Sequence, residues 1–485
     1  MPHTARRHLD LTAAARSVLR ESGFEVDLSG KARSQLDAMT EPLAADDARD
    51  LRELPWSSID NATTRDLDQV EAAESLGDGA TRIRVAIADV DSRIPKGSPL
   101  DAHAARNTVS VYAGDTVLPM LPERLSTDLT SLVEGADRLA LVAEMVVDAD
   151  GRTSGCAVYR ALVRNRAQLD YESVGAWLAG TGPLPAKAAA AGMAEQLRVQ
   201  GDAARRLRQQ REARGALELE TIEARPVLKD GRVVDIEVTD KGRARDLIED
   251  FMIAANAAVA GFLEEHDVAW IRRLVPPPER WPRIVELARR LGETLPPEPD
   301  RPALAAFLRK RRAADPAGFP HLSVSVVKLL GAGRYVVEHR GEELAGHFGL
   351  AVQDYTHSTA PNRRFADLVS QRLVKAVLAG TRVPYTDAEL DYAARHCTEM
   401  EDRARRVERL LRKLAAMDLV QDRVGDVFDA IVTGASAKGT WVRVRHPAIE
   451  GKVVRGERGM DVGDHVRVRL VQLDPERGYI DFVRG

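Results

Sequence analysis

The stretch LPWSSIDNATTRDLDQ, residues 54–69, carries three aspartates that guide the interpretation of the whole chain. Asp60 follows an apolar residue, and a threonine-rich connector leads from it to Asp66 and Asp68. Residues at i and i+2 of an extended segment point to one side, and the connector can fold Asp60 back beside them. Converging carboxylates repel one another unless a cation neutralises them, and their hard oxygens favour Mg²⁺ or Mn²⁺ over zinc. The alternative is a solvated acidic loop.

Residues 50–420 around this stretch mix strand and helix patterns. Apolar residues alternate over residues 82–90 and 139–148, as they do in half-buried strands. Helical spacing covers residues 193–214, 248–266 and 390–420. We therefore expect an α+β fold, in which a large mixed sheet is flanked by helices.

The last part of the chain changes character at about residue 424. Five short apolar-alternating segments, separated by turn glycines, fill about 60 residues, which predicts a five-stranded OB barrel. The order of its features is similar to the S-one type of ribosomal OB fold, and this resemblance implies binding of single-stranded RNA. Trp441 could stack on a base or fill the barrel core, and Arg443, Arg445 and Lys452 could form a local basic patch.

The first residues of the chain read as helical and polar. Two helical stretches, residues 11–22 and 32–39, lie on either side of Gly23. They could form a helix-turn-helix fragment or a small helical cap on the next domain. The predicted domains are thus a small helical region over residues 1–49, a catalytic domain over residues 50–423 and an OB domain over residues 424–485.

Composition excludes several classes of protein. The chain has 485 residues, 44% apolar and 30% charged, which is typical of a folded protein with several domains. Its two cysteines, Cys156 and Cys397, match no CxxC spacing, so we expect neither disulfides nor a zinc knuckle, and a reducing cytoplasm. We expect no membrane span, because no run of 18 apolar residues occurs. The net charge of −4 argues only weakly against a nucleic-acid binder, because acids for metal and a basic channel can coexist.

A second group of candidate residues lies in HFGLAVQDYTHSTAPNRRFADL, residues 347–368. Arg363 and Arg364 follow a proline and precede a helix expected from about Ala366. Guanidinium groups at this place could clamp a phosphate or stabilise charge in a phosphoryl transition state, or they could simply be surface arginines. His347 and His357 lack a paired-ligand spacing and are expected to be structural hydrogen-bonding residues.

Five blocks together resemble the catalytic domain of the ribonuclease II/ribonuclease R family. They occur in the family's order at residues 54–68, 85–90, 108–132, 248–256 and 347–372. The resemblance implies processive, Mg²⁺-dependent hydrolysis of single-stranded RNA from the 3′ end to nucleoside 5′-monophosphates, with Mn²⁺ as an alternative ion. A monomer without membrane attachment is expected.

The resemblance also implies roles for individual residues. Asp66, Asp68 and Arg363 fall on catalytic positions, and Asp60, Asp66, Asp68 and Gln69 fall on the metal-binding positions. Residues expected to contact RNA are Tyr112, which would stack on the terminal nucleotides, Tyr171, Glu249, Arg364 and, in the barrel, Trp441.

Three departures from the family pattern are visible. The family has a fourth acid where this chain has Gln69, so one metal could bind loosely or use Glu71 or water. A second stacking aromatic is replaced by Leu219, which implies a shorter base stack. The chain has no room for the two cold-shock barrels that usually precede the catalytic domain. We therefore expect a different RNA entrance, which the N-terminal helices could form and which could admit RNA with nearby duplex.

Several alternatives remain open at this point. If Gln69 abolishes turnover, the chain would be an RNA-binding or regulatory protein. A third hypothesis is a metal-dependent DNase. Asp89 could support the site or cap a strand end. The basic run over residues 403–413 could line an RNA path or form i,i+4 pairs with neighbouring acids.

Overall fold

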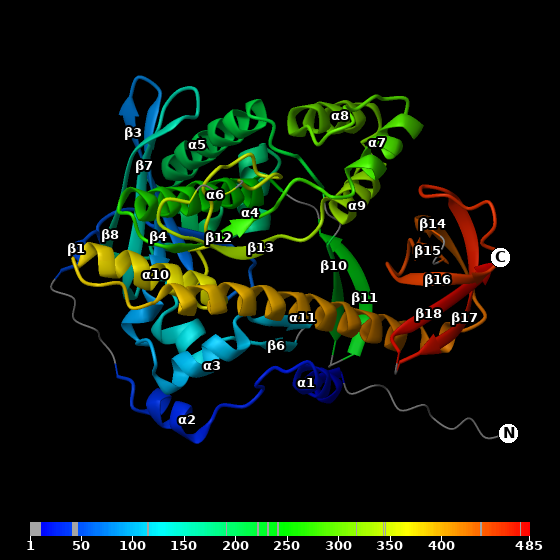
Figure 1. Ribbon diagram of the computed structural model, residues 1–485, viewed down its shortest axis with the longest axis horizontal. Helices are drawn as coiled ribbons and strands as arrows, with labels where there is room; N and C mark the ends of the chain where they lie inside the picture. Colours follow the sequence, from blue (N-terminus) through cyan, green and yellow to red (C-terminus); the bar gives the residue numbers. More distant parts are fainter. Residues whose placement is uncertain are drawn as a thin grey trace.

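The computed structural model describes residues 11–40, 47–113, 116–190, 192–220, 223–229, 232–239, 242–316, 318–342, 344, 346–436, 439–475 and 477–485. An α+β body built on a large sheet is joined by one long helix to a small closed barrel (Figure 1). This arrangement confirms the predicted fold class.

The body is built on a seven-stranded sheet with the strand order β1-β8-β7-β4-β3-β2-β9. Neighbours from β8 to β2 run antiparallel, whereas β1 lies parallel to β8 and β9 lies parallel to β2. The strands are β1 (Arg49–Asp50), β2 (Ser57–Asp60), β3 (Gln69–Gly77), β4 (Ala80–Ala88), β7 (Asp137–Val147), β8 (Thr153–Arg164) and β9 (Ala167–Asp170).

Strands β4 and β7 match the alternation predicted for residues 82–90 and 139–148. Strand β4 ends at Ala88, before the predicted end. The side chain of Asp89 accepts a hydrogen bond from the NH of Ser92 and starts a 3-10 turn at Val90–Ser92. Asp89 therefore caps the strand end, as one of the two interpretations proposed.

Helices cover both faces of the sheet (Figure 1). Ile83 and Val85 of β4 pack against α4, α5 and α6, and Ala86 and Ala88 pack against α3 and α10 on the other side. Successive strand residues point to opposite faces, so β4 is buried on both sides. These helices are α3 (Pro99–Asn107), α4 (Tyr171–Ala179), α5 (Met193–Ala213), α6 (Arg243–Glu265) and α10 (Phe365–Leu378).

Short strand pairs and a helical group complete the body. The pairs are β5 (Val111–Ala113) with β6 (Thr116–Leu118), β10 (Glu223–Lys229) with β11 (Arg232–Thr239), and β12 (Trp270–Leu274) with β13 (Arg334–Glu338). The helical group has its own apolar core around Trp281 and Phe319. It consists of α7 (Trp281–Arg290), α8 (Arg301–Ala314) and α9 (Phe319–Leu330).

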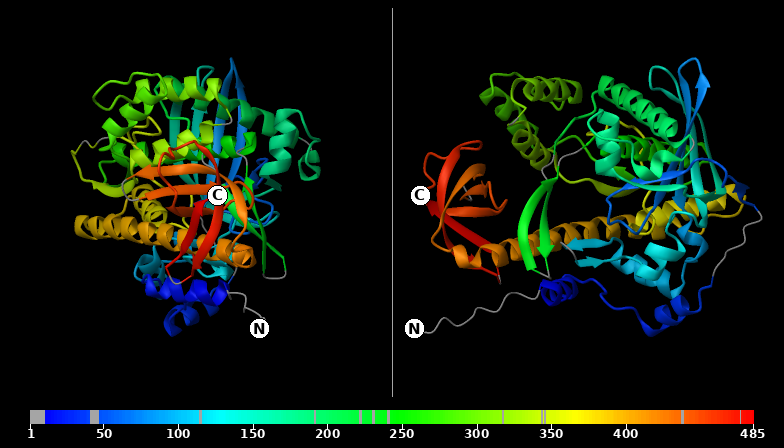
Figure 2. Two further views of the ribbon diagram at one scale, coloured as in Figure 1. Left: turned by 90° about the vertical axis from the view of Figure 1, so that its right-hand side faces the viewer. Right: turned by 180° about the vertical axis from the view of Figure 1, so that it is seen from behind.

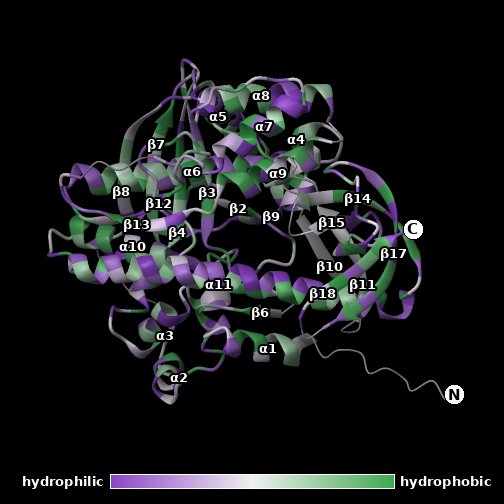
Figure 3. Ribbon diagram, turned by 45° about the vertical axis from the view of Figure 1, so that its right-hand side comes forward, coloured by the Kyte–Doolittle hydropathy of each residue, from purple (hydrophilic) through white to green (hydrophobic). Residues whose placement is uncertain are grey.

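Helix α11 (Asp387–Val420) connects the body to the barrel and is about 50 Å long at 1.5 Å per residue. Thr386 and Glu389 form a capping box at its start. The right-hand view in Figure 2 shows it running from the body, past the β10–β11 hairpin, to the barrel. Figure 3 shows hydrophilic residues over much of its visible side. In the described part of the chain, no helix is both long enough and apolar enough to cross a membrane.

The two N-terminal helices, α1 (Leu11–Glu21) and α2 (Gly30–Asp37), belong to two different apolar cores. Leu19 of α1 packs with side chains of α11, and Leu36 of α2 packs with side chains of α3. Gly23 has a left-handed φ of +89° directly after α1, where the predicted helix ends.

The barrel confirms the five predicted strands, which close in the order β14-β15-β16-β18-β17. Its interior is filled by apolar side chains that include Phe428, Val442 and Phe482. A Cβ atom at Gly451 would lie 2.5 Å from the Phe482 ring, so this strand position requires glycine. The strands are β14 (Val427–Ser436), β15 (Gly439–Val444), β16 (Glu450–Arg455), β17 (His465–Asp474) and β18 (Tyr479–Arg484).

Candidate active site

The loop that carries the three aspartates connects β2 to β3. Asp60 is the last residue of β2, and its Oδ1 accepts hydrogen bonds from the NH of Asn61 (2.6 Å) and the hydroxyl of Thr64 (2.9 Å). Asp60 thus folds the start of the loop, as side chains of this type do in turns. We call residues 60–68 the acid loop.

A second loop supports the acid loop from behind. The Ser131 hydroxyl donates to the carbonyl of Arg65 (2.8 Å) and accepts from the NH of Leu67 (3.0 Å). The NH of Leu132 donates to the carbonyl of Leu67 (2.9 Å). These bonds are fully buried at Ser131, so they fix the loop backbone and with it the side chains of Asp66 and Asp68.

Asp68 is the buried centre of the site, with 2% of its surface exposed. Its Oδ1 accepts a hydrogen bond from the NH of Asn362 (3.0 Å), and its Oδ2 lies 3.4 Å from Nε of Arg363. Oδ2 is buried and has no hydrogen-bond partner among the residues that the structure describes. Burial raises the pKa of Asp68 to about 7, although Arg363 and the Asn362 NH act in the opposite direction. The fold therefore unites the two motifs that are far apart in sequence.

The segments of Arg363 and Tyr112 are joined along their backbones. The NH of Ser110 donates to the carbonyl of Arg363 (3.0 Å), and the NH of Phe365 donates to the carbonyl of Thr108 (2.8 Å). The Arg363 side chain is 47% exposed, and Tyr112 is 41% exposed, so both are accessible to a ligand.

Asp66 lies within reach of both exposed groups. It is half-buried, and burial raises its pKa, while Arg363 and the Tyr112 side chain oppose the increase. The NH of Tyr112 also donates to Oε1 of Glu408 (3.1 Å), which fixes β5 against α11. Asp66, Asp68, Arg363 and Tyr112 therefore form one group.

Arg364 has surroundings different from those of its neighbour Arg363. Its Nε and Nη2 form a two-point ion pair with Asp367, at 2.9 and 2.8 Å. Asp367 is fully buried and also accepts the NH of Ala360 (2.8 Å). The pair holds the start of α10 in place, which is a structural role, and the predicted contact of Arg364 with RNA stays a prediction.

Tyr171 begins α4 next to the acid loop. The guanidinium of Arg245 lies 4.6 Å from the centre of its ring and donates to Oδ1 of Asn61 (2.8 Å). Burial raises the pKa of the Tyr171 hydroxyl, and the charges of Asp60 and Glu71 add to this increase. Glu249 is exposed on α6, beside Asp250 and near Arg208 of α5.

Gln69 and Glu71 lie at the start of β3 and point to the same face, because strand side chains alternate. Both are buried, with 7% and 0% of their surfaces exposed. In the described part of the chain, neither carboxylate oxygen of Glu71 has a hydrogen-bond partner. Burial raises the pKa of Glu71 well above its ordinary value, and the charge of Asp60 adds to the increase.

The donor set of the acid loop fits a hard divalent cation. Asp68 in the loop and Glu71 beside it on β3 retain buried oxygens without partners among the described residues, and burial disfavours the charged forms of both acids. Carboxylate oxygens of this kind are ligands of Mg²⁺ and Mn²⁺. A cation would supply the charge that the protein does not.

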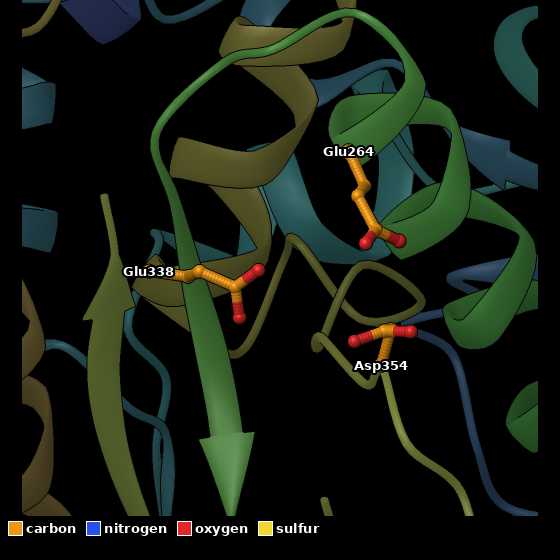
Figure 4. A group of neighbouring side chains, drawn as sticks. All are labelled: Glu264, Glu338 and Asp354. Atoms are coloured by element: carbon orange, nitrogen blue, oxygen red, sulfur yellow. The ribbon is translucent and has the colours of Figure 1, made fainter. Parts of the chain in front are cut away.

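A second acidic group, elsewhere in the body, is more compact than the acid loop. Glu264, Glu338 and Asp354 bring ligand oxygens within 4.8 Å of one another, the one such group among the residues that the structure describes (Figure 4). Arg272, which is 2% exposed, forms ion pairs with Glu338 and with Asp354 (3.1 Å). We call these four residues the Arg272 cluster. Because Arg272 supplies the positive charge, the acids of this cluster lie close together as partners of an internal ion pair.

Trp441 lies on the outside of the barrel, so the core-filling alternative is wrong. Its neighbours Thr440 and Val442 are buried, and Nζ of Lys452 lies 5.9 Å from the centre of its ring. Gly434 faces it from β14, and a Cβ atom there would be 3.6 Å from the ring.

The outer face of β15 turns toward the helical group of the body. Burial lowers the pKa of His321 in α9, and the charges of Arg443, His465 and Arg445 lower it further. Arg443 pairs with Glu450 (2.6 Å), and Arg290 of α7 pairs with Asp461 of the barrel (3.2 Å). Trp441 shares this face, since it alternates with the buried residues of β15.

The other candidates have structural roles. His357 hydrogen-bonds the Tyr335 hydroxyl (2.8 Å), and Nδ1 of His347 accepts the NH of Leu350 (3.1 Å). In the basic run, Arg405 pairs with Glu401 and Asp402, which favours the solvent-pairing interpretation. Leu219 packs against the core of α7–α9.

Sequence reasoning missed the groups that hold the site. Ser131 and Thr130 lie inside the motif block at residues 108–132, but no sequence pattern indicated that they support the acid loop. The Thr130 hydroxyl donates to Oδ1 of Asn362 (2.6 Å), whose NH in turn holds Asp68. No local signal identifies Arg245, which approaches from α6 only in the folded chain.

A cavity of about 650 Å³ lies elsewhere, between β8, α5 and α6. Its lining includes Arg152, Cys156, Arg211 and Asp250, and none of the predicted site residues. We base the site on the acid loop, because paired charges such as Arg211 and Asp250 already satisfy each other in this cavity.

Two family models match the chain: the RNB domain over residues 48–380 and the RNase II-type exonuclease C-terminal S1 domain over residues 426–485. Ribonuclease R of Thermotoga maritima is 31% identical over 470 residues, which cover 90% of this chain and 64% of that protein. The chain spans 55–64% of the length of such curated relatives.

Solved structures share the fold. Mycoplasma genitalium RNase R in complex with ribose methylated single-stranded RNA has a TM-score of 0.88 at 21% identity, covering 98% of this chain and 78% of that one. Yeast Ssd1, a pseudonuclease, has a TM-score of 0.71 at 18% identity, covering 95% and 57%. With the acid loop, Arg363 and the barrel in the matched ranges, the chain belongs to the RNB-domain family and carries a C-terminal S1 domain of the RNase II type.

Proposed function

We propose that this protein is a 3′-to-5′ exoribonuclease, which hydrolyses single-stranded RNA processively to nucleoside 5′-monophosphates with Mg²⁺ or Mn²⁺. One observation carries the proposal. The buried carboxylate of Asp68 keeps one oxygen without a hydrogen bond, 3.4 Å from the half-exposed guanidinium of Arg363. An acid and a cationic group held in this way can act together on a phosphodiester.

The acid loop would hold the metal through Asp60, Asp66 and Asp68, with Gln69 as a neutral neighbour. Bound divalent cations lower the pKa of water and offset charge on a phosphate. Asp68 would orient the attacking water through its free oxygen. Arg363 would offset the charge that develops on the phosphate, as a guanidinium can with two donors at once.

The exposed aromatic residues would position the RNA. Tyr112 would stack on the terminal base and Trp441 on a base further along, each worth about 1–3 kcal/mol. Tyr171, with Arg245 on its ring, would contact RNA beside the acid loop, and Arg364 would contribute a further contact. Glu249 would accept a hydrogen bond from a ribose 2′-OH, by which a site distinguishes RNA from DNA.

We further propose three domains, over residues 1–49, 50–423 and 424–485, in a monomer. Cys156 is exposed and unpaired and Cys397 is buried and unpaired, which supports a reducing cytoplasm. RNA with duplex next to a 3′ overhang is proposed as a further substrate.

A second candidate function is an RNA-binding protein with weakened catalysis. Gln69 favours it, because a neutral amide is a weaker ligand for a hard cation than a carboxylate. In that case the barrel and Tyr112 would bind RNA while the acid loop holds metal poorly.

The test is incubation of uniformly labelled single-stranded RNA with the full chain in Mg²⁺, in Mn²⁺ and in EDTA, with product sizes read over time. We expect mononucleotides only with metal, and much slower release from DNA of matched sequence. Asp68→Asn should bind RNA without cutting it, and Asp150→Asn, an exposed surface acid, serves as the control. RNA binding without release in either metal would favour the second candidate, and equal rates on DNA would indicate a DNase.

A further inference from the structure

Glu71 is a buried acid whose position on β3 is related to that of Gln69. The strand starts at Gln69, and side chains two residues apart share a face. Glu71 therefore lies on the same face as Gln69, about 6.6 Å further along the strand. Glu71 pairs with Ser57 of β2, the strand that ends at Asp60. Glu71 therefore lies on the hairpin closed by the acid loop, three residues after Asp68 and opposite the residue three before Asp60.

The Glu71 side chain is fully buried, and neither of its carboxylate oxygens has a hydrogen-bond partner. Nε2 of the buried Gln200 donates to the backbone carbonyl of Glu71 (3.3 Å) and not to its carboxylate. Buried acids are almost always paired, hydrogen-bonded or bound to a metal. Among the residues that the structure describes, neither carboxylate oxygen of Glu71 therefore finds a hydrogen-bond partner.

The groups around Glu71 belong to the proposed metal site. The charge of Asp60 acts on Glu71, and the charges of both acids act on the Tyr171 hydroxyl. Arg245 and Arg363 are the cations that act on Tyr171 in turn. Glu71 therefore lies within electrostatic reach of Asp60 and of the Tyr171 hydroxyl.

We propose that Glu71 is a displaced fourth acidic ligand, which gives the divalent cation the carboxylate that position 69 lacks. Its side chain is one methylene longer than that of aspartate, which recovers part of the distance along the strand. The inference rests on the metal site of the proposed function. Its rival is a structural role, in which Glu71 stays protonated and touches no metal.

The experiment measures Mn²⁺ alone binding to the full chain, by isothermal titration calorimetry and by the electron paramagnetic resonance signal of free Mn²⁺. Glu71→Gln keeps the shape of the side chain and removes its charge, so the fold is expected to persist, as circular dichroism will verify. We expect the Kd for Mn²⁺ to rise about 10-fold or more. Glu74→Gln, an exposed acid on the same strand, is the control and should leave Kd unchanged.

A second variant tests the displacement itself. Gln69→Asp combined with Glu71→Gln moves the carboxylate to position 69, and should restore the Kd for Mn²⁺ to within about 3-fold of the parent chain. An unchanged Kd in Glu71→Gln, or no Mn²⁺ binding by the parent chain, would overturn the inference. The RNA assay tests the proposed function separately. If the chain cuts RNA and Glu71→Gln leaves the Kd for Mn²⁺ unchanged, only this inference is wrong. If the chain binds Mn²⁺ through Glu71 but does not cut RNA, only the proposed function is wrong.

Discussion

The acid loop and the Arg272 cluster are two acidic regions of one molecule with opposite charge arrangements. The Arg272 cluster is the more compact, with its ligand oxygens within 4.8 Å of one another, yet Arg272 bonds two of its three acids. At the acid loop, Nε of Arg363 lies 3.4 Å from Oδ2 of Asp68 without a hydrogen bond, and nearly half of the Arg363 side chain is exposed.

We infer from this difference that unsatisfied oxygens, more than proximity, indicate which acidic region would bind a cation. A buried acid needs a counter-charge, and the Arg272 cluster carries its own. At the acid loop, Arg363 supplies one positive charge beside Asp68, but Oδ2 of Asp68 and both carboxylate oxygens of the nearby Glu71 have no hydrogen bond among the described residues, so these acids can take further charge from a cation. Removing the arginine from each region should therefore have different consequences.

Arg272→Ala should reduce the free energy of unfolding by about 3–5 kcal/mol, because it leaves Glu338 buried without its partner. Urea denaturation followed by circular dichroism measures the change. Arg363→Ala is the matched variant and should lose no more than about 1 kcal/mol, since its side chain is half exposed and its pair with Asp68 is open. Equal losses in the two variants would break the comparison.

Arg363→Ala should instead lower kcat on single-stranded RNA by roughly 10²–10³-fold, as expected when one group that stabilises charge in the transition state is removed. Single-turnover assays at saturating RNA measure the rate. Arg364→Ala is a poor control because its ion pair supports α10, so Arg152→Ala, an exposed arginine, is used. A full rate in Arg363→Ala would mean that this guanidinium does not act on the phosphate.

The metal-free chain should lose stability as the pH rises. Burial raises the pKa of Asp68 from 3.8 to about 7, so the folded state binds the proton that the unfolded state releases. The stability is fully present below the unfolded pKa and is lost as the pH rises toward the folded pKa. Between about pH 5 and about pH 8 the wild type should lose about 2–3 kcal/mol relative to Asp68→Asn.

Chemical denaturation in EDTA at the two pH values measures this difference. Saturating Mg²⁺ should remove most of it, because the ion takes the place of the proton. The same slope in wild type and Asp68→Asn would show that Asp68 is not the group that titrates.

The smallest effects belong to the stacking residues, which carry no charge. Trp441→Ala and Tyr112→Ala should each weaken RNA binding by about 1–3 kcal/mol, roughly 5- to 150-fold in Kd, without loss of the fold. Fluorescence anisotropy with a labelled single strand measures Kd. Tyr479→Ala, an exposed aromatic on β18, is the control. No change in Kd for Trp441→Ala would remove the barrel face from the RNA path.

The fold was largely predictable because its signals are local. Alternation predicted β4 and β7, and turn glycines predicted the five barrel strands. The end of β4 was misplaced because the alternation continues through Asp89, whose side chain caps the turn instead.

The site was less predictable, because its supports come from distant segments. The aspartates and Arg363 were identified from their motifs, but the bond from the Asn362 NH to Asp68 joins residues 294 positions apart. Strand parity could not place Trp441 until its neighbours were known to be buried. The pairing of Arg364 with Asp367 likewise needed the start of α10 in three dimensions.

The most direct test compares one acid from each region. Asp68→Asn and Asp354→Asn are measured beside the wild type in single-turnover hydrolysis of labelled single-stranded RNA with Mg²⁺. We expect nucleoside 5′-monophosphates from the wild type and from Asp354→Asn at similar rates, and a rate roughly 10³-fold lower from Asp68→Asn with RNA binding retained. Equal hydrolysis by wild type and Asp68→Asn would contradict the claim that the unsatisfied acid loop is the active site.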